Sequence, residues 1–154
     1  MKRYALIFTL VMAITAGFGC AKKSADAAYG DDISPELNAA IQQITDARVY
    51  FAFNKFDIKS EYKEMLKGKA DLIKRYSTIR VRIEGNCDER GTQEYNLALG
   101  ERRARAAYEH LVTLGVNPGQ LEAISYGKEN PAVQGSGESA WSKNRRDDFR
   151  VVAH

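Results

Sequence analysis

The segment 79–84 reads IRVRIE, in which apolar and charged residues alternate without a break. Successive side chains of a strand point to opposite faces of a sheet. The alternation therefore predicts a strand with one buried face and one face in water. When one face of a sheet stays in water, helices cover only the other face. The segment thus favours a two-layer sandwich over a sheet with helices on both faces.

The sequence on either side of this strand alternates between strand and helix patterns. Strands are predicted from β-branched and aromatic residues, and helices from apolar residues at helical spacing. The further predicted elements are a strand at 49–53, helices at 60–76 and 93–114, a strand at 121–126, a helical turn at 140–144 and a strand at 146–152. The prediction is an α/β two-layer sandwich, β-α-β-α-β-(α)-β, with helices packed on one face of a mixed four-stranded sheet. The residues do not determine the order of the strands.

The first 19 residues have the pattern of a lipoprotein signal peptide. Two basic residues precede an uncharged, mostly apolar run at 4–18, which is shorter than the roughly 20 residues of a membrane span. Gly19, a small residue, directly precedes Cys20. This resembles the bacterial lipobox, in which the cysteine is acylated, for example with palmitate, and becomes the new N-terminus. Gly17 stands where the lipobox usually has Leu, so plain secretory cleavage and retention as a membrane anchor are alternatives.

Residues 20–47 are predicted to form the lipidated cysteine and a tether, and residues 48–154 the globular domain. The segment 21–33 is small and polar without periodicity, which is typical of a flexible tether. The residues SPE at 34–36 predict the start of a short helix that runs to about residue 47. Ala21 follows the cysteine where some lipoproteins have Asp. By resemblance to enterobacterial lipoproteins, this favours sorting to the outer membrane.

The charge balance excludes a general nucleic-acid-binding protein. The chain has 23 basic and 20 acidic residues, and without Lys2 and Arg3 the balance is 21 to 20, a net charge of +1. Nucleic-acid binding needs a basic excess concentrated on one face. Two histidines and two cysteines at unrelated positions have no metal-ligand spacing, so neither a metal nor another cofactor is expected.

An acidic and a basic side chain meet where the strand at 79–84 joins the following long helix. On a helical wheel of about 100° per residue, Arg103 and Asn96 lie within about 60° of the apolar Leu99. A guanidinium on this inward side needs an acid or a bound anion. Asp88 lies where the strand ends and the helix begins, close to Arg103. The aspartate can therefore bind an ammonium group while the arginine binds a carboxylate. The alternative is that Asp88 and Arg103 pair with each other and only close the loop.

Several ordered blocks of sequence point to one known family. They are VYFAFN at 49–54, DERGT at 88–92, EYNL at 94–97, LGERRA at 99–104, SYGKENP at 125–131 and KNRR at 143–146. With these blocks, the stretch 49–152 resembles the OmpA-like peptidoglycan-binding domain family. Within that family it is most similar to the peptidoglycan-associated lipoproteins (Pal).

The resemblance implies a binding site rather than an active site. In this family the residues matching Asp88 and Arg103 hold the ammonium and the carboxylate of diaminopimelate, in the peptide stem of peptidoglycan. Phe53 and Asn54 match residues that line the same pocket. Asn96 matches a residue that helps to hold the loop.

Two departures from the family pattern affect the surroundings of the pocket. The family usually reads GHAD or GHTD where residues 85–88 read GNCD, so a histidine that flanks the pocket is missing. Asn54 stands where many Pal sequences carry Asp, which removes one acid near the ligand. Both departures bear on affinity and not on the role of Asp88.

The resemblance implies an outer-membrane lipoprotein whose domain faces the periplasm and tethers the membrane to peptidoglycan. It also implies a Tol-Pal-type system, which serves cell division, with TolB as a partner. The alternatives are a protein-interaction module with a vestigial pocket and a cysteine-dependent peptidoglycan hydrolase that uses Cys87 and His110. A flagellar stator protein is excluded because the run at 4–18 is too short for a span and holds no acid.

Overall fold

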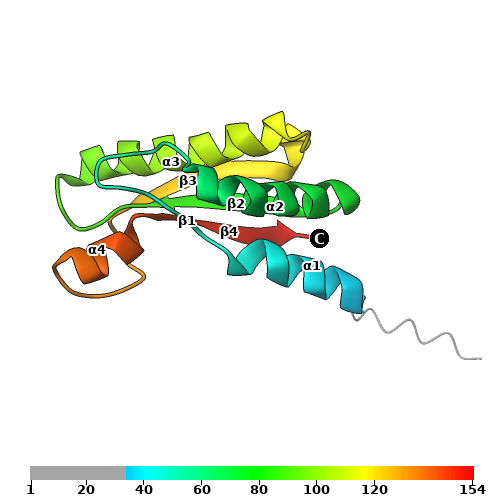
Figure 1. The fold of residues 1–154 in the computed structure, drawn as a ribbon, viewed down its shortest axis with the longest axis horizontal. Helices are drawn as coiled ribbons and strands as arrows, with labels where there is room; N and C mark the ends of the chain where they lie inside the picture. Colours follow the sequence, from blue (N-terminus) through cyan, green and yellow to red (C-terminus); the bar gives the residue numbers. More distant parts are fainter. Residues whose placement is uncertain (1–33) are drawn as a thin grey trace, which may run out of the picture. The chain divides into compact units, whose positions relative to one another are not determined.

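The computed structural model describes residues 34–154, which form the fold in Figure 1. The predicted signal peptide at 1–19, the lipidated Cys20 and the tether as far as residue 33 lie outside the described residues. Within the described part of the chain, no helix is long and apolar enough to cross a membrane.

The sheet has four strands and both parallel and antiparallel neighbours. The strands are β1 (Val49–Tyr50), β2 (Arg80–Asn86), β3 (Leu121–Gly127) and β4 (Arg146–Ala153). Their order is β1-β4-β2-β3, in which β2 and β3 run parallel and the other two pairs antiparallel. The predicted mixed sheet is therefore confirmed, and the structure supplies the strand order that the sequence left open.

The three longest helices pack their apolar sides on one face of this sheet. They are α1 (Pro35–Asp46), α2 (Lys63–Arg75), α3 (Gln93–Thr113) and α4 (Glu138–Asn144), with 3-10 helices η1 (Ser60–Tyr62) and η2 (Pro118–Gln120). Buried side chains of α1, α2 and α3 form one core with those of β2 and β4, including Ile44, Leu66, Leu111, Ile83 and Phe149. Residues 34–154 thus contain a complete hydrophobic core of their own.

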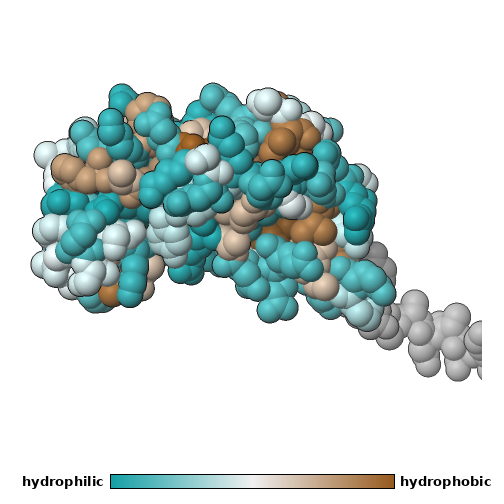
Figure 2. All heavy atoms as spheres, in the orientation of Figure 1, coloured by the Kyte–Doolittle hydropathy of each residue, from teal (hydrophilic) through white to brown (hydrophobic). Residues whose placement is uncertain are grey.

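The other face of the sheet carries charged pairs. Arg82 lies 2.8 Å from Glu122, and Arg150 lies 3.3 Å from Glu84, in each case between neighbouring strands. One face of the sheet is thus covered by helices and the other carries charged pairs, which confirms the predicted two-layer sandwich. Figure 2, in the orientation of Figure 1, shows that apolar side chains on the visible side of the molecule form small separate areas among hydrophilic residues.

The first strand is shorter than predicted, because the chain leaves the sheet after Tyr50. The N–H of Phe51 still bonds the carbonyl of Arg145 at 3.0 Å, but the N–H of Lys55 closes a turn on the carbonyl of Ala52 at 3.1 Å. Asn54 has a φ of 57°, in the left-handed region that a strand does not use. Phe51 and Phe53 therefore lie in a loop and not in a strand, and this loop forms one wall of the pocket.

Two glycines let α3 approach the sheet closely. A Cβ on Gly85 would clash with the backbone carbonyl of Gly100, and a Cβ on Gly100 would lie 2.9 Å from the carbonyl oxygen of Gly85. Contacts of that kind do not occur with real side chains, so both positions need glycine. The close approach places the first half of α3 directly over the end of β2.

Candidate functional site

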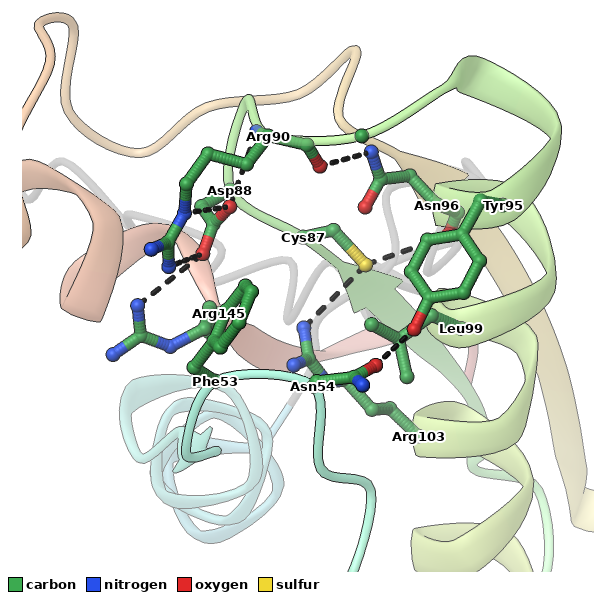
Figure 3. A pocket seen from close by; sticks show the side chains of 11 residues that line it. Phe53, Asn54, Cys87, Asp88, Arg90, Tyr95, Asn96, Leu99, Arg103 and Arg145 are labelled. Atoms are coloured by element: carbon green, nitrogen blue, oxygen red, sulfur yellow. Dashed lines mark hydrogen bonds and ion pairs between the residues drawn. The ribbon is translucent and has the colours of Figure 1, made fainter.

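One pocket gathers all five residues that the sequence analysis assigned to ligand binding. It has a cavity of about 190 Å³ and lies between the loop after β1, the loop between β2 and α3, and the first turns of α3. Figure 3 shows the side chains around it. Its lining consists of Phe53, Asn54, Cys87, Asp88, Arg90, Gly91, Tyr95, Asn96, Leu99, Arg103 and Arg145.

Arg103 is fully buried and bonds mainly to backbone carbonyls. Its Nε donates to Lys55 O at 2.9 Å, and its Nη1 donates to Asn86 O at 2.7 Å and to Cys87 Sγ at 3.4 Å. Its Nη2 donates to Ala52 O at 3.4 Å. A guanidinium has five N–H groups, so one N–H of Nη2 is left over.

No carboxylate contacts this buried cation. Among the described residues, Arg103 belongs to no ion pair within 4.0 Å, so the alternative in which Asp88 and Arg103 close on each other is wrong. Burial lowers the pKa of the Arg103 guanidinium from its usual value. A buried positive charge whose partners are a thiol and neutral carbonyls is a favourable place for an anion.

Asp88 is already bound by two arginines. Its Oδ1 accepts from the backbone N–H and the Nε of Arg90, both at 3.1 Å, and its Oδ2 accepts from Arg90 Nη2 at 2.8 Å and Arg145 Nη1 at 3.2 Å. Burial alone would raise the pKa of Asp88, but these hydrogen bonds together hold it below its usual value. Asp88 is therefore ionised, and its carboxylate is paired with Arg90 and Arg145 and not with Arg103.

Arg90 and Arg145 hold Asp88 in different ways. The Arg90 guanidinium lies 4.0 Å from the ring centres of both Phe53 and Trp141, and its side chain is 32% exposed. The Arg145 side chain is 6% exposed, donates to Phe51 O at 3.0 Å and pairs with Glu138. Arg90 is therefore the more exposed of the two arginines, whereas Arg145 is buried.

Sequence reasoning missed these two arginines although both stand in blocks that it quoted. The available signal for Arg90 was its position two residues after Asp88, within DERGT. For Arg145 the signal was a pair of basic residues before the last strand, but its contact with Asp88 spans 57 residues of sequence. Trp141 was placed only within a helical turn and was given no role.

Two asparagines and a tyrosine fix the loops around the pocket. Asn96 donates to Arg90 O at 2.8 Å and to Thr92 O at 3.0 Å, which holds the loop before α3. The Oδ1 of Asn54 accepts a hydrogen bond from the hydroxyl of Tyr95 (Figure 3). The loop after β1 is thereby joined to α3. Of these residues, sequence reasoning missed Tyr95.

Cys87 lacks the environment of a catalytic thiol. Its sulfur is buried, donates to Asn96 O at 3.3 Å and accepts from Arg103 Nη1 at 3.4 Å. Burial raises the pKa of this thiol to about 11. His110 lies in the last turn of α3 and does not line the pocket. The described residues also contain no group of three His, Cys, Asp or Glu side chains that could hold a metal ion.

Comparisons with known proteins agree on one family. The model of the OmpA family matches residues 50–145. A peptidoglycan-associated lipoprotein of Pseudomonas putida is 39% identical over 166 residues, which cover 97% of this chain and 98% of that protein. A peptidoglycan-associated lipoprotein of Haemophilus influenzae is 51% identical over 98 residues, 64% of each chain.

Solved structures agree with the sequence relatives. The crystal structure of the peptidoglycan-associated lipoprotein from Burkholderia pseudomallei matches with a TM-score of 0.67 and 43% identity, over 68% of this chain and 88% of that one. The C-terminal domain of Helicobacter pylori MotB matches with a TM-score of 0.65 but 22% identity, over 70% and 85%, and shows the fold alone.

The chain therefore belongs to the OmpA family, and within that family it groups with the peptidoglycan-associated lipoproteins. The names of these relatives describe envelope lipoproteins, and none of the names describes an enzyme.

The raised pKa of Cys87 gives a direct test of the hydrolase alternative. In a chain that begins at residue 34, Cys87 is the only cysteine. We expect iodoacetamide at pH 8 to alkylate it about a hundredfold or more slowly than an exposed cysteine, because only the thiolate reacts. Mass spectrometry of the folded protein measures the rate, and the same protein unfolded in urea is the control. Equal rates in both states would show an activated or exposed thiol.

Proposed function

We propose that this chain is an outer-membrane lipoprotein that binds the peptide stem of peptidoglycan non-covalently and so tethers the membrane to the cell wall. The observation that carries the proposal is the buried guanidinium of Arg103, which faces the pocket and has no anionic partner among the described residues. The relatives that cover nearly the whole chain are named peptidoglycan-associated lipoproteins, which supports the ligand class.

In the proposed complex, a carboxylate of diaminopimelate accepts a hydrogen bond from the remaining N–H of Arg103. The ligand then supplies the negative charge that this buried cation lacks. A hydrogen bond to a charged group contributes about 1.5–3 kcal/mol. Such an interaction orients the ligand and gives a modest affinity for a single domain.

The ammonium of diaminopimelate binds at Asp88 by replacing Arg90. Both oxygens of Asp88 are already occupied, and Arg90 is the exposed one of its two arginines. When Arg90 moves out, the rings of Phe53 and Trp141 offer their faces to the arriving cation. The exchange of one cation for another keeps the net binding energy small, so each contact is reversible.

Anchoring turns this modest affinity into a firm link. Acyl chains on Cys20 would hold the domain close to the wall, which raises its effective concentration, and many copies act together. Ala21 favours the outer membrane, and the domain would face the periplasm. Membership of a Tol-Pal-type system with TolB as partner is part of the proposal, and it is supported only by the relatives.

A protein-interaction module with a vestigial pocket is the second candidate. The pairing of Asp88 with Arg90 and Arg145 favours it, because the carboxylate has no need of a ligand in this state. The two candidates differ in whether the pocket residues affect binding to the cell wall.

Binding to isolated peptidoglycan sacculi tests the proposed function. We expect Asp88→Asn and Arg103→Lys in residues 34–154 each to weaken co-sedimentation by about tenfold or more, because each removes one charge-assisted contact. Arg105→Ala is the matched control, since Arg105 lies on α3 and contacts Glu101 at 3.5 Å and the ring of Tyr108, all three outside the pocket. Thermal unfolding shows that each variant is folded. Equal binding by all four proteins would reject the pocket and support the interaction module.

Removal of the proposed acylation site tests the anchor separately. We expect Cys20→Ser in the full chain to move the protein from the membrane fraction to the soluble periplasmic fraction, because no acyl chain can then be attached. Immunoblots of the two fractions measure the distribution, and Ser24→Ala in the same segment is the control. A Cys20→Ser protein that stays with the outer membrane in cells depleted of peptidoglycan would contradict lipid anchoring.

A further inference from the structure

A second buried acid lies beside the pocket and takes no part in the proposed contacts with the ligand. Asp147, on β4, is fully buried, and within residues 34–154 neither of its carboxylate oxygens has a hydrogen-bond partner. Almost all buried polar groups in proteins are paired, so such a carboxyl group requires an explanation. Asp147 lies close to the pocket, because it pairs with Gly85, next to the last residue of β2, and the loop that carries Asp88 follows directly after β2.

Asp147 points towards the helices. Phe149, two residues further along β4, belongs to the core under the helices, and alternate residues of a strand share a face. Gly85 shares that face, because α3 contacts it at Gly100. Arg103 lies one turn after Gly100, so the geometry brings its guanidinium above Asp147.

The charge of Arg103 is the strongest favourable influence on an ionised Asp147. Burial raises the pKa of Asp147 well above its usual value, and Arg103 is the largest opposing charge. The two groups are not in contact, since no ion pair within 4.0 Å joins them within residues 34–154. The Arg103 guanidinium therefore lies between Asp147, which it does not contact, and the pocket.

The other charged groups near Asp147 do not take over the influence that Arg103 has on its ionisation. Asp148 disfavours its ionisation and Arg146 favours it, but these two residues pair with each other at 2.8 Å. Cys87, which also contacts Arg103, keeps its proton because its pKa is raised to about 11. Asp88 stays ionised throughout, held by Arg90 and Arg145.

We propose that Asp147 is a positioning residue that sets the strength of the anion site through Arg103, so that binding of a ligand carboxylate is coupled to uptake of a proton by Asp147. The inference rests on the proposed function. When a carboxylate binds in front of Arg103, it offsets the positive charge that favoured ionised Asp147. Ionised Asp147 and the ligand carboxylate therefore compete for the positive charge of Arg103. When Asp147 is protonated, only the ligand carboxylate interacts with that charge.

The sign of the pH dependence follows from this competition. Ligand binding favours the protonated acid, so by linkage the affinity falls as pH rises through the range in which Asp147 ionises. A single coupled proton gives a slope of at most about tenfold per pH unit. Between pH 5 and 8 the carboxylates of diaminopimelate stay ionised. A titration in that range thus reports on the protein.

The test compares residues 34–154 of the wild type with Asp147→Asn, which keeps the shape of the side chain but cannot ionise. The probe is a purified muropeptide that contains diaminopimelate, and calorimetry measures its affinity at several values between pH 5 and 8. We expect the wild-type affinity to fall with rising pH and the variant affinity to change less. Identical profiles would overturn the inference.

A second measurement needs no variant, in case Asp147→Asn does not fold. Calorimetry of the wild type in two buffers of different ionisation enthalpy gives the number of protons taken up on binding. Uptake of a fraction of a proton is expected, and zero uptake at every pH would overturn the inference. Absence of any binding by the folded wild type would instead contradict the proposed function.

Discussion

The architecture of the pocket depends on the hydrogen bonds of one buried guanidinium. Arg103 donates to carbonyls of Ala52 and Lys55 in the loop after β1, and of Asn86 at the end of β2. These bonds join three separate parts of the chain while they leave the positive charge without a contacting acid. The same interaction therefore holds the loop in place and makes the pocket attractive to an anion.

The surrounding structure keeps this guanidinium in position. Gly85 and Gly100 allow α3 to lie close to β2, and Asn96 fixes the loop that carries Asp88. On the far side of the pocket, Arg145 directly follows α4 and binds both Asp88 and the backbone of the first loop. The pocket thus has a buried positive charge at Arg103 on one side and, at Arg90, one partly exposed side chain over Asp88.

The sequence predicted the elements with regular patterns and missed those that depend on distant contacts. The alternation at 79–84 predicted β2. Helical periodicity placed Arg103 on the inward side of the long helix, and in the structure this residue is fully buried. The segment 49–53 has strand-like composition, but only two of its residues form β1, because the pocket loop begins at Phe51. The contact of Asp88 with Arg145 has no local signal, since it forms only when α4 packs beside the loop.

In the proposed complex the pocket holds a doubly charged amino acid between Arg103 and Asp88. A crystal structure of residues 34–154 with a muropeptide that contains diaminopimelate would show whether it does. We expect a ligand carboxylate within hydrogen-bond distance of Arg103 Nη2, with the ligand ammonium at Asp88 and the Arg90 side chain displaced. A ligand bound elsewhere on the domain, with Arg90 still on Asp88, would show that the pocket is not the binding site.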